Sequence, residues 1–478
     1  MDFFVNGKWA SSVSARTMAV LNPATGAPVD TVPVANAADA ELAIAAAATA
    51  FKSWRKVPMA RRAKLQHAAA QRLRERADEF SRLLTLELGR PLAGSKVEIE
   101  RSADLLDYFA EEGLRLRGEI PMINEEFERV FVVQEPVGVV VAITPFNYPI
   151  TLLVFKLGAA LITGCTVVAK PASDTPLTTL LLAELLHQVG YPDGVFNAIT
   201  GAGSELGRIL VEHPIPRKIG FTGSSPAGKR IAAMASATNK RLTLEMGGQS
   251  PAIVCRDADL EVAVPALVRH AFANSGQFCY RVNRIYVERE IYAPFVDKFA
   301  QLTAALKVGN GLDATSDMGP LVNQEIFRTS VEHVEDALAK GGRAAAGGAR
   351  LLGGDYDHGY FFAPTLLADT TQAMKIMSEE TFGPVVGAMP VDSLSEAIAL
   401  ANDSPFGLAG YVFCSDLAVA LRMAEQLDAG SVWVNDIHRS YNMVPFGGYK
   451  ESGLGREKSH HGLDQYLELK TIYLSTTK

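Results

Sequence analysis

The feature of this sequence that most limits its possible folds is an alternation of strand and helix patterns that begins near residue 137. Residues 137–144 form an almost continuous run of apolar, largely β-branched side chains, typical of a parallel strand buried on both faces. Further strands are expected at 166–169, 195–199, 218–222 and 241–245, and helices at 151–163, 176–189, from 204 and at 226–235. This repeated β-α-β order predicts an α/β fold with a doubly wound parallel sheet.

The segments before and after this block also carry helix patterns. An Ala-rich helix is expected to begin at Asp39 and run to about Trp54, and a long amphipathic helix is expected at 59–88, ended by Gly89. Further helices are expected at 95–115, 260–273, 291–306, 325–340, 394–402 and 416–427. Because residues 252–445 repeat the alternation less regularly, the sequence predicts a second α/β domain there.

Length, charge and cysteine content narrow the class of protein. A chain of 478 residues is too long for one simple core, so two or more domains are expected. The net charge of −7, without a basic cluster that has aromatic residues interleaved, argues against a nucleic-acid partner. Cys165, Cys255, Cys279 and Cys414 are widely separated, so neither a disulfide framework nor a metal site is predicted. We expect a cytoplasmic protein with reduced thiols, without a signal peptide and without a membrane partner.

Two short stretches suggest covalent catalysis. Cys279 ends a Gly-Gln-Phe-Cys turn that follows a predicted helix, and Glu245 lies at the end of a predicted strand, just before two glycines. A thiol nucleophile with a carboxylate base can attack a carbonyl group and then release it. Taken alone, Cys279 could equally be a small buried hydrophobic side chain, and Glu245 a solvated charge.

Loops that follow the predicted parallel strands supply further candidates, because ligands of such sheets bind beyond the carboxyl ends of the strands. These loops are residues 144–149 (Thr-Pro-Phe-Asn-Tyr-Pro), 170–176 (Lys-Pro-Ala-Ser-Asp-Thr-Pro) and 220–224 (Gly-Phe-Thr-Gly-Ser). The last one opens a helix, so Ser224 and nearby backbone N–H groups could hold a pyrophosphate. Each loop could also be a plain turn, and the GxGxxxG spacing at 201–207 departs from the dinucleotide fingerprint.

These motifs, in this order, resemble those of the NAD(P)-dependent aldehyde dehydrogenase superfamily. Two more belong to the set, at 379–384 (Glu-Glu-Thr-Phe-Gly-Pro) and 445–453 (Pro-Phe-Gly-Gly-Tyr-Lys-Glu-Ser-Gly). The matches extend from about residue 5 to about residue 470, almost the whole chain. The resemblance implies an enzyme that oxidises an aldehyde to its carboxylic acid with NAD(P).

The resemblance assigns catalytic roles to three residues. The Cys279 thiolate is expected to attack the aldehyde carbon, Asn147 and the Cys279 backbone N–H to stabilise the oxyanion, and Glu245 to activate the water that hydrolyses the thioester. A CoA-acylating enzyme, which typically lacks this glutamate, and a non-catalytic structural homologue are the alternatives. The presence of both Glu245 and Cys279 argues against them.

The resemblance also implies a nicotinamide cofactor. The expected cofactor-binding residues are Thr144, Pro145, Phe146, Lys170, Ser173, Phe221, Gly223, Ser224, Gly247, Glu380 and Phe382. Lys170 is expected on the adenosine ribose, Glu380 on the nicotinamide ribose and Phe382 beside the nicotinamide ring. Many NAD-preferring members have a glutamate where this chain has Ser173, so we expect NAD or NADP, with NADP tolerated and the preference left open.

The implied architecture has two doubly wound α/β domains and a small β oligomerisation element. The expected cofactor-binding domain comprises residues 1–116 and 137–246, the catalytic domain 247–445, and the oligomerisation element 117–136 with 446–478. The strand pattern at 466–474 has no obvious partner nearby in the sequence, and such a strand can pair with another subunit's sheet edge. A homodimer or homotetramer is therefore expected.

Departures from the family motifs bear on the substrate. The expected substrate residues are Leu152, Phe155, Tyr280, Arg281, Arg439, Tyr441 and Phe446. Because guanidinium groups bind carboxylate or sulfonate bidentately, Arg281 and Arg439 predict a short semialdehyde with an anionic end, such as succinic semialdehyde. Both arginines could also be ordinary solvated side chains. The alternative substrate is an aromatic or hydroxy-aldehyde packed on the aromatic members of the set.

Overall fold

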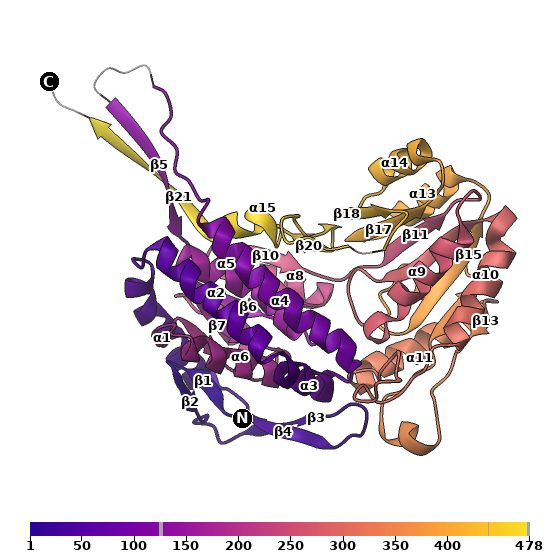
Figure 1. Cartoon of the computed structure of the whole chain (residues 1–478), viewed down its shortest axis with the longest axis horizontal. Helices are drawn as coiled ribbons and strands as arrows, with labels where there is room; N and C mark the ends of the chain where they lie inside the picture. The colour runs from indigo at the N-terminus through magenta and orange to yellow at the C-terminus, as the bar shows by residue number, and fades with distance from the viewer. Residues whose placement is uncertain (124–127, 438, 476–478) are drawn as a thin grey trace.

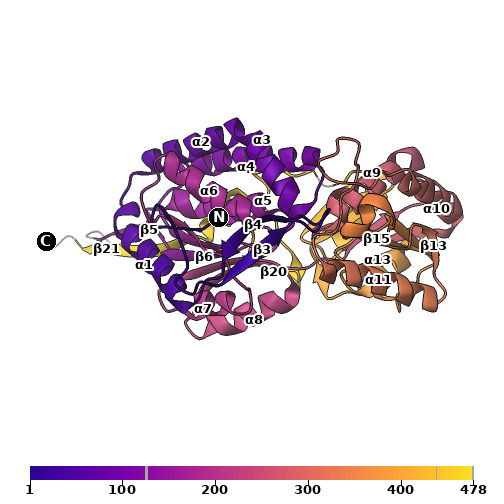
Figure 2. The same ribbon diagram turned by 90° about the horizontal axis from the view of Figure 1, so that it is seen from below.

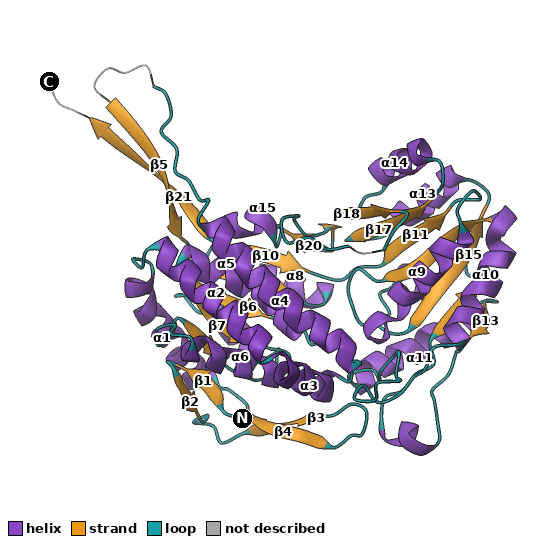
Figure 3. Cartoon of the chain, viewed as in Figure 1, coloured by secondary structure: helices purple, strands orange, loops and turns teal. Residues whose placement is uncertain are grey.

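The computed structural model describes residues 1–123, 128–437 and 439–475 and shows two α/β bodies joined near the middle of the molecule (Figures 1 and 2). In each body helices flank a sheet (Figure 3). Residues 124–127, 438 and 476–478, which the predicted domain boundaries include, lie outside the described residues. Among the described residues, no helix combines the length and apolar character needed to cross a bilayer.

The first body contains an eight-stranded sheet with the order β2-β1-β8-β7-β6-β9-β10-β20. The strands are β1 (Phe3–Val5), β2 (Lys8–Ala10), β6 (Val139–Ile143), β7 (Thr166–Lys170), β8 (Phe196–Ala198), β9 (Lys218–Thr222), β10 (Arg241–Glu245) and β20 (Gly453–Leu454). The strands from β8 to β10 are parallel, as predicted. The chain runs from β6 through β7 to β8 on one side and through β9 to β10 on the other. This reversal marks the carboxyl ends of β6 and β9 as the ligand side.

The central strands are buried on both faces, which explains their unbroken apolar runs. Val140 and Ala142 of β6 pack in a core with α2 to α6, whereas Val139 and Val141 pack in a second core with α1, α7 and α8. These helices are α1 (Ala37–Trp54), α2 (Met59–Glu75), α3 (Ala77–Leu88), α4 (Leu92–Gly113), α5 (Pro149–Thr163), α6 (Leu177–Gln188), α7 (Leu206–Glu212) and α8 (Ser225–Ser236).

The second body confirms the predicted second α/β region. Its seven-stranded sheet has the order β13-β14-β15-β12-β11-β17-β18. The strands are β11 (Ser250–Val254), β12 (Val282–Glu288), β13 (Arg343–Ala346), β14 (Thr365–Ala368), β15 (Val385–Val391), β17 (Ala409–Phe413) and β18 (Ser431–Val434). The helices are α9 (Leu260–Phe272), α10 (Arg289–Ala304), α11 (Gln324–Ala339), α12 (Lys375–Ser378), α13 (Leu394–Asn402) and α14 (Leu417–Gln426). Separate cores lie on the two faces of this sheet.

A two-stranded antiparallel sheet extends away from both bodies (Figure 1). It pairs β5 (Glu128–Pro136) with β21 (Leu467–Ser475), so the predicted C-terminal strand finds its partner in the segment expected. Apolar side chains on β21 are exposed, including Tyr473 at 75%. Within the described part of 446–478, β20 lies in the first sheet and Tyr466 packs in the first core. The domain boundaries and the oligomeric state stay predictions.

Several details of the N-terminal helices differ from the prediction. The expected helix at 59–88 is two helices, because the backbone of Arg76 leaves the helical region at φ −101° and ψ 16°. The second of them ends at Gly89, as predicted, with φ +86°. Asn36, not Asp39, is the N-cap of α1, and Asp39 completes the capping box at the third helical position. The start of α4 at Leu92 is three residues earlier than expected.

The short elements complete the chain. They are β3 (Thr17–Leu21), β4 (Pro28–Pro33), β16 (Phe406–Gly407), β19 (Tyr449–Lys450), α15 (Ser459–Asp464) and the 3-10 turns Ala273–Gly276 and Gly354–His358.

The cysteines are less isolated than their spacing suggests. Cys255 and Cys414 follow the neighbouring strands β11 and β17, and their sulfur atoms lie with an Asp257 carboxylate oxygen within 4.8 Å of one another.

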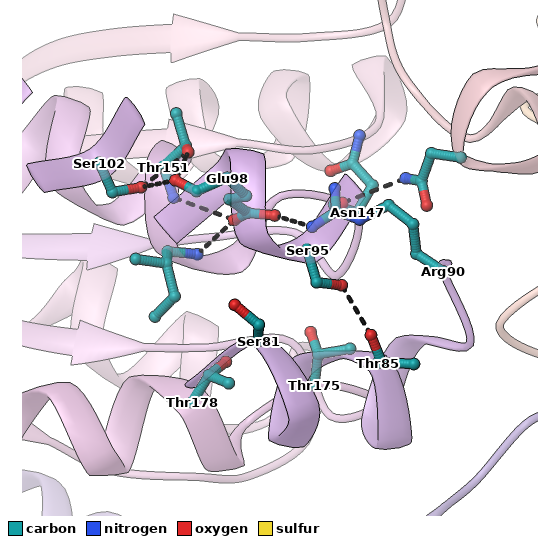
Figure 4. A network of polar contacts seen from close by, with 12 residues as sticks. Ser81, Thr85, Arg90, Ser95, Glu98, Ser102, Asn147, Thr151, Thr175 and Thr178 are labelled. Atoms are coloured by element: carbon teal, nitrogen blue, oxygen red, sulfur yellow. Dashed lines mark hydrogen bonds and ion pairs between the residues drawn. The ribbon is translucent and has the colours of Figure 1, made fainter. Parts of the chain in front are cut away.

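The helices that follow β6 and β7, α5 and α6, have no side-chain cap from their own N-cap residues. Buried glutamates from other helices cap them instead. The Glu98 carboxylate accepts from the backbone N–H groups of Ile150 and Thr151 at 3.0 and 3.1 Å and is ion-paired with Arg90 (Figure 4). Glu87 similarly accepts from the start of α6. Glu98 therefore fixes the start of α5, directly after the loop that carries Asn147.

We predict that Glu98→Gln lowers the free energy of unfolding by about 3–5 kcal/mol, because Arg90 would lose its partner while buried. Urea denaturation followed by circular dichroism measures the change. Glu75→Gln, which breaks an exposed pair with Arg72, is the matched control and should leave the midpoint unchanged. Equal midpoints for Glu98→Gln and the wild type would contradict the prediction.

Candidate active site

Cys279 follows a turn whose backbone is strained. Asn274, Ser275 and Gly276 have φ values of +49°, +57° and +74°, and the first two are not glycine. Such conformations persist where surrounding contacts hold them. Here the Ser275 hydroxyl donates to the carbonyl of Gly319 at 2.9 Å, and the Gln277 side chain accepts from the Val322 N–H at 2.9 Å. The turn is therefore fixed by side-chain hydrogen bonds.

The same turn is bonded to the loop after β6. The Asn274 amide nitrogen donates to the carbonyl of Asn147 at 3.2 Å. Asn147 and Cys279 both line one cavity of about 570 Å³ between the two bodies. The structure thus brings together the predicted nucleophile and the predicted oxyanion donor. Asn274 belongs to the nucleophile motif, but the sequence does not indicate its bridging contact.

Glu245 lies at the carboxyl end of β10, buried and outside the set of cavity-lining residues. Neither of its carboxyl oxygens has a hydrogen-bond partner among the residues the structure describes. Burial, and then the charge of Glu457, raise the pKa of Glu245 well above its ordinary value. Lys156 opposes this shift only partly, because its ammonium is already bonded to Glu457 at 2.6 Å.

The electrostatic surroundings of Cys279 keep its thiol protonated. Burial raises the pKa of Cys279, and the carboxyl groups of Glu380 and Glu245 raise it further. A thiolate is the nucleophilic form, so the resting thiol needs a nearby group to accept its proton. Gly248 permits the close packing of this region, since a Cβ there would lie 2.2 Å from the Cys279 carbonyl oxygen.

The predicted cofactor residues gather at the carboxyl ends of β6, β7, β9 and β10. Thr144, Pro145 and Phe146 follow β6, Lys170 ends β7 with Ser173 just beyond, and Phe221, Gly223, Ser224 and Gly247 follow along β9 and β10. Three observations fit a dinucleotide. The Thr144 hydroxyl is buried without a partner in the described chain, Lys170 donates only to the Pro171 carbonyl, and Ser224 at the start of α8 makes no side-chain cap.

Glu380 and Phe382 reach this edge from the second body. The Glu380 carboxylate accepts from the Gly248 N–H at 2.9 Å, and burial raises the pKa of Glu380 to about 7. The Phe382 ring lies edge-on to Phe146, with centroids 5.6 Å apart. Phe382 has φ +53°, a strained value that presents its ring toward the loop after β6. Their positions agree with the predicted nicotinamide end, whose occupation stays a prediction.

The substrate cavity has an aromatic wall. Leu152, Phe155, Tyr280 and Phe446 line it, as predicted, and Phe155 and Tyr280 each pack edge-on against Phe446. Two further lining rings, Tyr148 and Phe278, were not among the predicted substrate residues.

The structure corrects three other substrate assignments. Arg281 is fully buried and donates to the Val385 carbonyl at 2.8 Å, and burial lowers its pKa to about 9. Its side chain is not among those that line the cavity. Arg439 is 70% exposed and paired with Asp436 at 2.5 Å. Tyr441 is 53% exposed, and neither residue lines the cavity.

Other cationic side chains line the cavity instead. Arg90, Arg101 and Lys458 all line it, together with the polar side chains of Ser440 and Asn442. Arg90 is neutralised by Glu98 and lies over the Tyr148 ring at 4.7 Å. Lys458 lies more than 350 residues after Arg90 and Arg101 in the sequence, so no local sequence pattern could identify the three together.

A doubly wound sheet with a cysteine-lined cavity at its ligand side suits an enzyme that acts on a carbonyl group beside a nucleotide cofactor. The chain belongs to the aldehyde dehydrogenase family, whose family model matches residues 9–472. This membership confirms the predicted family, fold class and class of enzyme.

Three relatives illustrate the similarity. The 3-sulfolactaldehyde dehydrogenase of Pseudomonas putida is 42% identical, with 98% of this chain and 96% of the relative covered. The succinate-semialdehyde dehydrogenase [NADP(+)] GabD of Escherichia coli is 40% identical, with the same coverage of 98% and 96%. The crystal structure of an NADP-dependent enzyme of E. coli superposes with a TM-score of 0.97 at 39% identity, covering 99% of this chain and 98% of the other.

We predict that Glu380→Gln lowers the pKa of the Cys279 thiol, because it removes one of the charges that raise it. Alkylation of Cys279 by iodoacetamide, measured against pH by peptide mapping, should then reach half its maximal rate at a lower pH than in the wild type. Glu379→Gln, which changes an exposed neighbour, is the control and should leave the profile unchanged. Identical profiles for Glu380→Gln and the wild type would contradict the prediction.

Proposed function

We propose that this enzyme oxidises a short aldehyde with an anionic far end to the carboxylic acid through a covalent intermediate on Cys279. The proposal rests mainly on one observation: Cys279 and Asn147 line the same cavity. A hydrogen bond from the Asn274 side chain to the Asn147 carbonyl joins the loops that carry them. Glu245 is the buried carboxyl group that interacts electrostatically with the thiol.

The chemistry assigned to these residues has two halves. In the first, the Cys279 sulfur bonds to the aldehyde carbon while its proton passes to the Glu245 carboxylate and on to solvent, and Asn147 with the Cys279 N–H stabilises the oxyanion. The oxidised nicotinamide, when bound, supplies the acceptor for the hydride lost from that carbon. In the second, Glu245 takes a proton from water, the water oxygen bonds to the thioester carbon, and the Cys279 sulfur departs.

NAD or NADP suits the cleft at the carboxyl ends of the parallel strands. Thr144, Lys170 and the start of α8 supply polar groups with bonding capacity to spare. Ser173 itself carries no carboxylate that would repel a 2′-phosphate, and the name of the E. coli relative includes NADP(+). Both observations support the use of NADP.

The substrate class is supported by the cavity and by the relatives. Arg101 and Lys458 line the cavity, and the sulfolactaldehyde and succinic semialdehyde of the relatives' names both carry an anionic end. The second candidate is an aromatic or hydroxy-aldehyde, which the rings of Tyr148, Phe155 and Phe446 favour. A comparison of kcat/KM for succinic semialdehyde, benzaldehyde and propanal separates the two, and we expect succinic semialdehyde to be highest.

We predict that Cys279→Ala lowers turnover of the best aldehyde by more than about 10³-fold, because the thioester cannot form. Cofactor binding, measured by calorimetry, should stay intact. Cys414→Ala removes a thiol outside the cavity and should retain activity. Substantial turnover by Cys279→Ala would show that another residue is the nucleophile.

We further predict that wild-type enzyme uses NADP and that Ser173→Glu shifts the ratio of kcat/KM toward NAD by about tenfold or more, because the new carboxylate would repel the 2′-phosphate. Ser173→Ala adds no charge and is the control, with the NADP activity retained. Strict dependence of the wild type on NAD would mean that a different residue closes the 2′ site.

A further inference from the structure

The backbone at Lys458 is unusual for a lysine. Lys458 has φ +61° and ψ 177°, a region that is close to glycine-only, because a Cβ there crowds the backbone. Glycine would relieve this strain, so the lysine side chain is retained at a cost in stability. Strain of this kind concentrates at functional sites.

The Lys458 side chain is a buried cation that faces the substrate cavity. Lys458 is 4% exposed and lines the cavity that contains Cys279. Its ammonium donates to the Ser440 hydroxyl at 2.5 Å and lies 6.0 Å from the centroid of the Phe155 ring. An ammonium has three donors, and no carboxylate pairs with this one in the described part of the chain. A buried charge without a counter-ion is costly.

A second cation of the same cavity increases that cost. Arg101 lines the cavity from α4 and, within the described ranges, forms no ion pair. Burial, and then the positive charge of Arg101, lower the pKa of Lys458 to about 8. Two like charges therefore face one cavity, whereas Arg90 in the same wall is neutralised by Glu98. An anion placed between Lys458 and Arg101 would relieve the repulsion and complete the ammonium's hydrogen bonds.

We propose that Lys458 and Arg101, with the Ser440 hydroxyl, form a subsite for the carboxylate or sulfonate at the far end of the aldehyde. The inference rests on the proposed function, since Cys279 in the same cavity would receive the aldehyde end. Lys458 and Arg101 replace Arg281 and Arg439 as the specificity-determining cations.

The test compares wild type with Lys458→Met, Lys458→Gly and Arg101→Gln on three aldehydes of similar length. The aldehydes are succinic semialdehyde for carboxylate, 3-oxopropane-1-sulfonate for sulfonate and butanal as the neutral compound. We expect each variant to raise KM for the anionic aldehydes tenfold or more and to leave kcat/KM for butanal within about twofold. The anion with the larger loss identifies the group that the subsite fits better.

Thermal unfolding separates this role from a structural one. Lys458→Gly and Lys458→Met should both unfold at a higher temperature than wild type, because both remove an unpaired buried charge. Lys458→Gly also removes the backbone strain. Lys450→Met is the matched control, because Lys450 also has a positive φ, of +49°, but is exposed and lies outside the cavity.

Two results would overturn the subsite. One is an equal loss of activity toward anionic and neutral aldehydes in the Lys458 variants, with lowered unfolding temperatures. The other is unchanged KM for both anions in all three variants. The proposed function fails separately, if wild-type enzyme oxidises none of the three aldehydes with either NAD or NADP.

Discussion

The hydrogen bond from the Asn274 side chain to the Asn147 carbonyl joins the two α/β bodies at the point where chemistry is expected. One body supplies the nucleophile turn and the other supplies the loop after β6. Each side is fixed independently, the turn by Ser275 and Gln277 and the loop by the Glu98 cap on α5. Precise placement of reacting groups is what turns such an arrangement into a catalyst.

Burial controls the protonation of the two predicted catalytic groups, Cys279 and Glu245. Burial raises the pKa of both Cys279 and Glu245, so each group resists losing its proton. Lys156 and Glu457 form a buried ion pair. Its two charges shift the pKa of Glu245 in opposite directions, because Glu457 raises this pKa and Lys156 lowers it. The Glu245 charge in turn raises the pKa of Cys279, so the buried cluster around Glu245 acts on the thiol through electrostatics.

Much of the fold could be predicted because it is encoded locally, in the apolar run at 137–144 and in helix patterns ended by residues such as Gly89. The family motifs likewise locate Cys279 and Asn147. The cations that line the cavity could not be predicted from the sequence. Arg281 is next but one to the nucleophile, yet its side chain points into the core of the second body. Lys458 reaches the cavity only through tertiary packing and a backbone conformation that the sequence does not suggest.

Trapping the covalent intermediate is the most direct measurement of the central claim. In Glu245→Gln, loss of the general base should slow hydrolysis by about 10²–10⁴-fold while acylation continues. Acid quenching after mixing with cofactor and succinic semialdehyde, followed by intact-mass and peptide analysis, should then find close to one acyl group per subunit, on Cys279. An enzyme that turns over under these conditions without any acyl adduct, or with the adduct on another residue, would contradict the assignment of Cys279 and Glu245.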